Sequence, residues 1–127
     1  LDTGLMGYLL RIREPDDIPA HAMKGAIFET FVVAELYKAF SHRGELPPLY
    51  FWRDQTGHEV DVIIDTGKKL VPIEVRAGET VVGSSFEGLR FFTSFGPPAS
   101  SQGVMVYGGE DLYQREDFLI RPWFQCF

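Results

Sequence analysis

The chain has 127 residues, of which 45% are hydrophobic and 14% aromatic, and eighteen acidic against twelve basic residues give a formal net charge of -6. This length predicts a single domain, 1–127, and the apolar content excludes a disordered chain. The negative charge argues against a surface that binds nucleic acid as a whole, so any contact with phosphates must be local.

Motifs for disulfides, zinc and membranes are missing from the sequence. Cys126 is the only cysteine and three histidines accompany it, which excludes an internal disulfide and leaves no spacing typical of zinc ligands. No run reaches the ~18 apolar residues of a membrane helix, and the first residues do not resemble a signal peptide. We expect a cytoplasmic protein without membrane contact. The start at Leu1, directly before an apolar arm over 5–12, suggests a fragment of a longer protein.

Apolar periodicity predicts the elements in chain order. Apolar residues recur at steps of three and four over 20–40, which is typical of a helix. Alternating runs around Gly67 are typical of a β-hairpin, and Ser84 or Ser85 can cap a second helix that ends near Ser94. The expected elements are a helix over 20–40, strands over 49–53, 58–65 and 70–76, a helix to residue 94, a strand over 103–107 and a candidate strand over 112–115. An apolar tail of open form follows over 118–127.

Strand pairing in the hairpin brings charged side chains together. With the turn centred between Gly67 and Lys68, opposite residues have numbers that sum to 135. Asp61 then lies opposite Glu74 and Glu59 opposite Arg76, all on one face, while Val60, Val62 and Ile64 fill the other face. Facing carboxylates repel unless a cation or a proton lies between them. Either a divalent metal such as Mg²⁺ or a simple ion pair with Arg76 would satisfy this requirement.

The first predicted helix adds further acids. Glu29 and Glu35 lie beside its apolar stripe, so either is a candidate third carboxylate of a site or an ordinary surface residue.

Three segments together resemble a known family. They are KGAIFETFV over 24–32, GHEVDV over 57–62 and PIEVRAG over 72–78. In their order and spacing they resemble the domain of unknown function 4143, the C-terminal part of many bacterial and archaeal AAA-type P-loop ATPases. The likeness covers nearly the whole chain. It implies that an ATPase domain lies upstream and is the partner of this one.

The resemblance also implies a fold and a chemistry. The expected fold is α/β (α+β), a three-layer restriction-endonuclease-like core of the PD-(D/E)XK type with a central mixed sheet and the order α-β-β-β-α-β. Asp61 and Glu74 would hold Mg²⁺ or Mn²⁺, position 76 would assist the attacking water, and Glu29 would be the acid from the helix. The reaction would be metal-dependent hydrolysis of a phosphodiester, with DNA as a further partner.

The sequence departs from that pattern at two points. Position 76 is arginine where the pattern has lysine, and a guanidinium stays charged and cannot accept a proton. The usual Pro-Asp entry is also missing, because His58, Glu59 and Val60 precede Asp61. No Gly-x-x-x-x-Gly-Lys-Ser/Thr motif is present, so ATP binding is expected only in the upstream domain.

Three hypotheses follow. The first is a nuclease-like domain, active or weakened by Arg76. The second is a catalytically inactive interaction or regulatory domain that docks the ATPase portion or another protein through the aromatic tail 123–127, whose residues could equally close the core. The third is a metal-independent nucleic-acid binder that uses Lys68, Lys69, Arg76 and Arg90.

Overall fold

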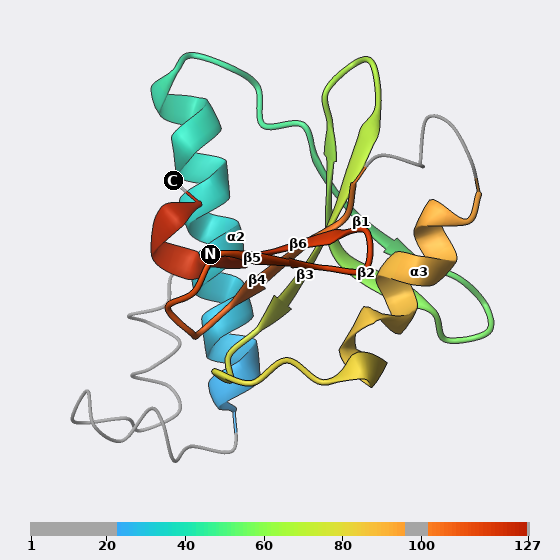
Figure 1. The fold of residues 1–127 in the computed structure, drawn as a ribbon. Helices are drawn as coiled ribbons and strands as arrows, with labels where there is room; N and C mark the ends of the chain where they lie inside the picture. The colour runs from blue at the N-terminus through green and yellow to red at the C-terminus, as the bar shows by residue number, and fades with distance from the viewer. Residues whose placement is uncertain (1–22, 96–101, 127) are drawn as a thin grey trace.

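A computed structural model describes residues 23–95 and 102–126. The expected arm over 5–12 lies outside these residues, as do Ala20 to Ala22 at the start of the first predicted helix. The described part is a mixed α+β fold in which a six-stranded sheet lies between two helices, as Figure 1 shows. None of the helices in the described ranges is long and apolar enough to cross a membrane.

The first helix, α2, spans Lys24–His42. Its buried side chains come from the predicted apolar stripe and its neighbours: Ile27, Val32, Val33, Ala34 and Leu36. Helix α2 ends where Gly44 adopts a φ of 73° and its N–H donates to the carbonyl oxygen of Ser41, a common way to stop a helix. The helix is therefore predictable from its period and its glycine stop.

The sheet has the strand order β1-β2-β3-β4-β6-β5. Strands β1, β2 and β3 are antiparallel, β3, β4 and β6 are parallel, and β5 pairs antiparallel with β6. The strands are β1 (Leu49–Arg53), β2 (Glu59–Asp65), β3 (Leu70–Arg76), β4 (Val104–Tyr107), β5 (Tyr113–Arg115) and β6 (Phe118–Pro122). The apolar tail, whose form the sequence left open, thus contributes an inner strand followed by a 3-10 turn, η3 (Trp123–Gln125).

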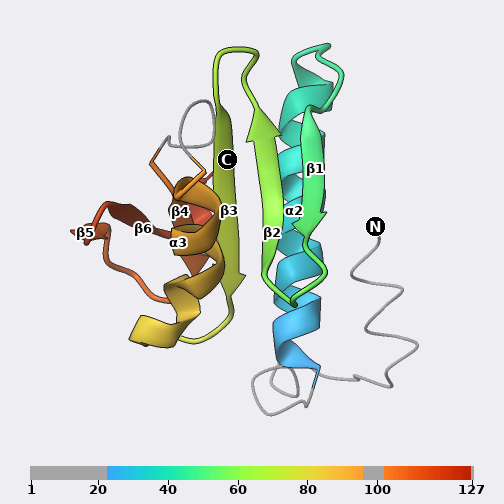
Figure 2. The same ribbon diagram turned by 90° about the vertical axis from the view of Figure 1, so that its right-hand side faces the viewer.

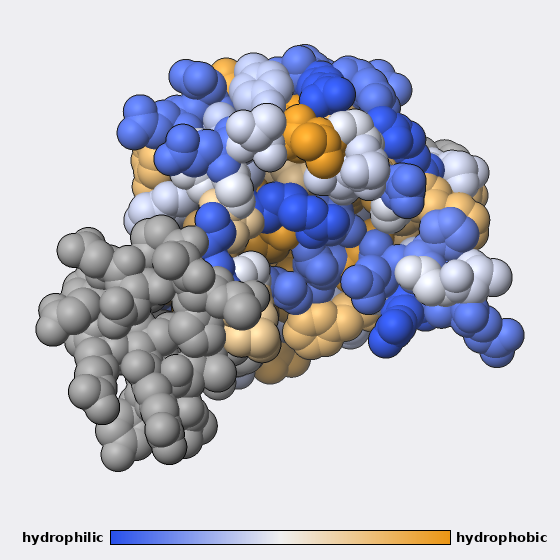
Figure 3. Space-filling view, turned by 90° about the horizontal axis from the view of Figure 1, so that it is seen from below, coloured by the Kyte–Doolittle hydropathy of each residue, from blue (hydrophilic) through white to orange (hydrophobic). Residues whose placement is uncertain are grey.

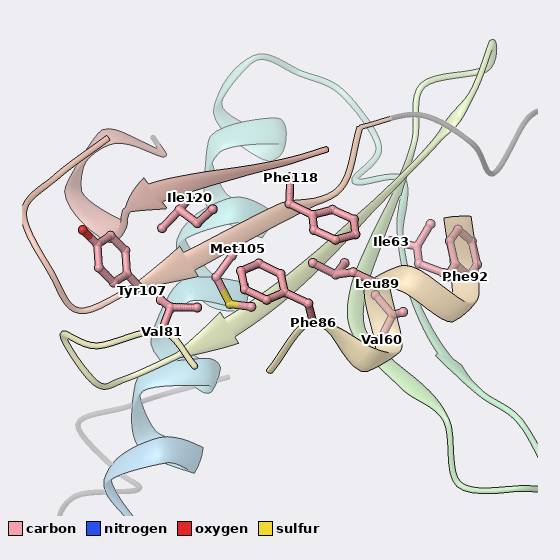
Figure 4. Packing of buried hydrophobic residues seen from close by; sticks show 10 residues of the cluster. All are labelled: Val60, Ile63, Val81, Phe86, Leu89, Phe92, Met105, Tyr107, Phe118 and Ile120. Carbon is pink, nitrogen blue, oxygen red and sulfur yellow. The ribbon is translucent and has the colours of Figure 1, made fainter. Parts of the chain in front are cut away.

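Each face of the sheet carries its own apolar cluster. Helix α2 covers one face, and the short helix α3 (Glu87–Thr93) covers the other (Figures 1 and 2). On the α3 face, Phe86, Leu89, Met105 and Ile120 are fully buried at the centre of a cluster that Figure 4 displays. The α2 face is filled by a second cluster that includes Val32, Val62, Ile73, Val75 and Val106. Because both faces are buried, the central strands read as continuous apolar runs.

The serine cap predicted for the second helix is wrong. Ser84 and Ser85 lie inside a 3-10 turn, η2 (Gly83–Phe86), and α3 begins only at Glu87 without a side-chain cap. Phe86 at the junction is fully buried. Its ring packs in the apolar cluster on the α3 face of the sheet.

Candidate functional site

The hairpin register agrees with the sequence prediction over most of its length. Val62 pairs with Ile73, Ile64 with Val71, and Asp65 with Leu70, so each pair of numbers sums to 135. Gly67 takes a φ of 82° in the turn, a conformation that a side chain disfavours. The ladder between β2 and β3 ends at Val62, one residue after Asp61, so the two strands separate where the acids lie.

A β-bulge in β2 re-aims the residues at this end of the hairpin. Tyr50 pairs with Ile63 but Trp52 pairs with Val60, so two residues of β2, Asp61 and Val62, stand opposite the single residue Phe51. The prediction that Val60 shares a face with Val62 and Ile64 is therefore wrong: Val60 packs in the α3 cluster and Val62 in the α2 cluster. The extra residue reverses the alternation of the pleat.

Asp61 uses its side chain to replace a missing backbone partner. Its Oδ2 accepts a hydrogen bond of 2.8 Å from the backbone N–H of Val75, at the point where the regular ladder has stopped. The same oxygen lies 3.4 Å from Nη1 of Arg76. Asp61 thus holds the separated strands together and pairs with the arginine.

Arg76 lies between the two predicted metal ligands. Its Nη1 is 2.9 Å from Oε2 of Glu74 and 3.4 Å from Oδ2 of Asp61, and it donates to the carbonyl oxygen of Val75 at 2.9 Å. The Arg76 side chain is 42% exposed, whereas the whole Glu74 residue is only 2% exposed. The guanidinium therefore covers the acids from the solvent side.

Burial raises the pKa of Glu74 to about 9, and the charge of Asp61 and a hydrogen bond with it add to the effect, in spite of Arg76. At neutral pH Glu74 thus keeps its proton and shares it with Asp61, while Arg76 balances the remaining carboxylate charge. The repulsion expected between facing acids is relieved by both a proton and a cation.

Glu29 approaches this cluster from α2. Burial raises the pKa of its carboxyl group, with further contributions from the charges of Asp61 and Glu59, which outweigh the opposing effect of Arg76. No ion pair or hydrogen bond reaches the Glu29 side chain within the part of the chain that the structure describes. Glu35, the other helix candidate, instead pairs with Lys38 at 3.1 Å.

Two hollows flank the cluster, and the acids divide between them. A hollow of about 410 Å³ is lined by Glu29, Phe51, Trp52, Arg53, Glu59, Val60 and Asp61. A smaller hollow of about 160 Å³ lies toward α3 and is lined in part by Glu74, Arg76, Ser85 and Gly88. Their linings include residues at the start of β2 and the end of β3. Figure 3 views the molecule from below and shows hydrophilic side chains between hydrophobic patches on that face.

The donor atoms suit a magnesium or manganese ion, but their arrangement does not. Carboxylate oxygens are the ligands that these hard cations prefer. In the described ranges, however, no group of three or more His, Cys, Asp or Glu side chains is placed to hold a metal ion. A cation between Asp61 and Glu74 would have to displace the Arg76 guanidinium and the proton of Glu74. In the present geometry the Arg76 guanidinium lies between the two acids.

The structure also places the residues of the nucleic-acid-binding hypothesis and of the aromatic-tail hypothesis. Lys68 and Lys69 lie in the hairpin turn, at the other end of β3 from Arg76, and Arg90 pairs with Glu116 at 2.6 Å. These cations form no continuous surface. In the aromatic tail, Trp123 packs edge-on against Phe31 of α2 with ring centroids 5.6 Å apart.

Exposure differs along the rest of that tail. Phe124 is 49% exposed, and Phe127 lies outside the described residues. Part of the tail therefore closes the core, as the sequence allowed.

Fold and site together define an α+β domain with a carboxyl, carboxylate and guanidinium cluster at the open end of a bulged hairpin. A family model described as Domain of unknown function (DUF4143) matches residues 24–124, and the chain belongs to this family. Among curated proteins, none matches the chain.

Proposed function

We propose that this chain is a nuclease-like domain of the PD-(D/E)XK type in which a guanidinium takes the place of the metal, so that it serves an AAA-type ATPase as a catalytically silent interaction domain. The single observation that carries the proposal is the position of Arg76 Nη1, 2.9 Å from Glu74 and 3.4 Å from Asp61. The succession of α2, three antiparallel strands, α3 and the parallel strand β4 agrees with such a core.

The chemistry of Arg76 supports the absence of catalysis in this proposal. A guanidinium cannot accept a proton from an attacking water at any working pH. Its charge already neutralises Asp61, and Glu74 is neutral while it keeps its proton at a pKa of about 9. The pair therefore offers little attraction for a second cation at neutral pH. ATP hydrolysis belongs, in this proposal, to the upstream domain.

A cleavage assay tests the proposal directly. The chain is incubated with plasmid DNA and with single-stranded DNA in Mg²⁺ or Mn²⁺, beside the variants Asp61→Ala and Glu74→Ala. We expect no cleavage above the level of either variant. Metal-dependent cleavage by the unmodified chain that both substitutions abolish would show that the domain is an enzyme and that the proposal is wrong.

The second candidate is a working or weakened metal-dependent nuclease. It is favoured by the contact between Asp61 and Glu74, by the charge of Asp61 beside Glu29, and by the 42% exposure of Arg76, which leaves its side chain room to swing outward. Asp61 and Glu74 would then hold Mg²⁺ or Mn²⁺. Substitution Arg76→Lys separates the candidates, because cleavage that appears only with lysine would identify a weakened enzyme.

A further inference from the structure

Strand β1 forms an edge of the sheet and carries exposed aromatic side chains. Among the described residues it pairs with β2 alone. Tyr50 is 57% exposed and Phe51 is 75% exposed. Edge strands usually carry charges or prolines that block pairing with another chain, but LYFWR has a single charge, at Arg53. This edge is therefore a ready template for an additional strand.

The larger hollow lies beside this edge and is acidic. Phe51 and Arg53 of β1 form part of its lining, together with Glu29, Glu59 and Asp61. Asp61 pairs with Arg76, so two further acids, Glu29 and Glu59, face one arginine, Arg53. Arg53 is only loosely engaged, with its Nε 3.9 Å from Glu59. A ligand that enters the hollow from the β1 edge meets an aromatic ring and a surplus of negative charge.

We propose that the β1 edge and the acidic hollow together bind an extended basic segment of a partner protein, which adds a strand beside β1. Alternate side chains of an added strand point to the same face of the sheet. A lysine or arginine on the α2 face would then reach Glu29 in the hollow, and its charge would lie over the ring of Phe51. This inference rests on the interaction role proposed above and names the chemistry of the partner.

Charge selects a basic peptide over the other occupants. The net charge of -6 attracts cationic segments from a distance and repels nucleic acid. A second copy of this chain would bring the same acids against each other across a shared edge. The opposite edge strand, β5, has only three residues, Tyr113, Gln114 and Arg115, and provides a natural control surface.

The experiment measures binding of a fluorescein-labelled ten-residue peptide in which arginine alternates with threonine and valine, by fluorescence anisotropy. Two further peptides keep its length: one replaces arginine by glutamate, and one keeps all arginines but places proline at every second position, which removes backbone donors. We expect binding of the first peptide only. Equal binding of the proline peptide would overturn the strand-addition proposal and reveal unspecific charge attraction.

Variants of the chain locate the contact. Phe51→Ala and Glu29→Gln are expected to weaken binding about fivefold or more each. The matched substitutions Tyr113→Ala at the β5 edge and Glu110→Gln in an exposed turn should leave it unchanged. Circular dichroism and melting of each variant establish that it is folded. If the folded variants Phe51→Ala and Glu29→Gln bound the peptide with unchanged affinity, the contact would lie elsewhere and the proposal would be rejected.

Two other outcomes would also overturn it. One is binding of a DNA oligonucleotide that is tighter than binding of the basic peptide and that the substitution Phe51→Ala abolishes. The other is self-association, seen as a concentration-dependent mass that Phe51→Asp abolishes. DNA cleavage is read in a separate assay, so failure of the silent-domain proposal and failure of peptide binding remain distinguishable.

Discussion

Glu74 offers a direct test of the charge state inside the cluster. Substitution Glu74→Gln replaces a buried carboxyl group by an amide of the same shape that can still accept from Arg76 and donate to Asp61. Because the pKa of Glu74 is raised from 4.5 to about 9, the folded chain keeps a proton that the unfolded chain releases. Such a group stabilises the fold fully below pH 4.5, and its contribution is lost as the pH rises toward 9.

The size of the effect follows from the proton linkage. While the folded chain holds one more proton than the unfolded chain, the free energy of unfolding falls by about 1.4 kcal/mol for each pH unit. Between pH 5 and pH 7 the loss amounts to roughly 2.5 kcal/mol. Glu74→Gln removes this titration. Between pH 5 and pH 7 the free energy of unfolding of the variant should therefore fall by roughly 2.5 kcal/mol less than that of the unmodified chain. Glu29, whose pKa is also raised, contributes equally to both proteins and cancels in the difference.

Urea unfolding at pH 5, 6, 7 and 8, followed by tryptophan fluorescence, measures the two slopes. Glu79→Gln serves as the matched control, because Glu79 is exposed and its substitution should leave the pH dependence unchanged. If Glu74→Gln and the unmodified chain lost stability with the same slope, Glu74 would be ionised in the folded protein. The Arg76 ion pair, and not burial, would then decide its charge.

Two further predictions concern packing at α3. A Cβ on Gly88 would clash with the backbone oxygen of Glu59, so Gly88→Ala should push α3 from the sheet and cost about 1–3 kcal/mol in urea unfolding. Gly25→Ala, with nothing within 4 Å of the added Cβ, should stabilise the chain slightly. Leu89→Ala should cost about 2–5 kcal/mol because Leu89 is fully buried, while Leu46→Ala, at 91% exposure, should leave the melting temperature unchanged.

The sequence is sufficient to predict α2, the three antiparallel strands and the hairpin register as far as the pair of Val62 with Ile73. The period of three and four in α2 arises because one helical stripe must be buried, and Gly67 marks a turn whose backbone disfavours side chains. Both signals are local. The register predicts only that Asp61, Glu74 and Arg76 lie at the same end of the hairpin. Their contacts are made by side chains beyond the last regular pair, Val62 with Ile73.

The bulge in β2 could not be predicted, because its signal is not local. Val60, Val62 and Ile64 alternate as in a regular strand, yet the pairing with β1 skips one residue at Phe51. Which face each residue takes therefore depends on a neighbouring strand and not on its own pattern. The direction in which Asp61 points, toward the hollow that Glu29 shares, is a product of that skipped residue.

The position of β4 in the middle of the sheet has a consequence for hydrogen exchange. β4 lies between β3 and β6, and Met105 and Val106 are buried on opposite faces of the sheet. We expect its amide protons to exchange with deuterium only when the whole domain unfolds, whereas those of the three-residue edge strand β5 should exchange through local fraying. The slowest amides of β4 thus report the global free energy of unfolding in native conditions.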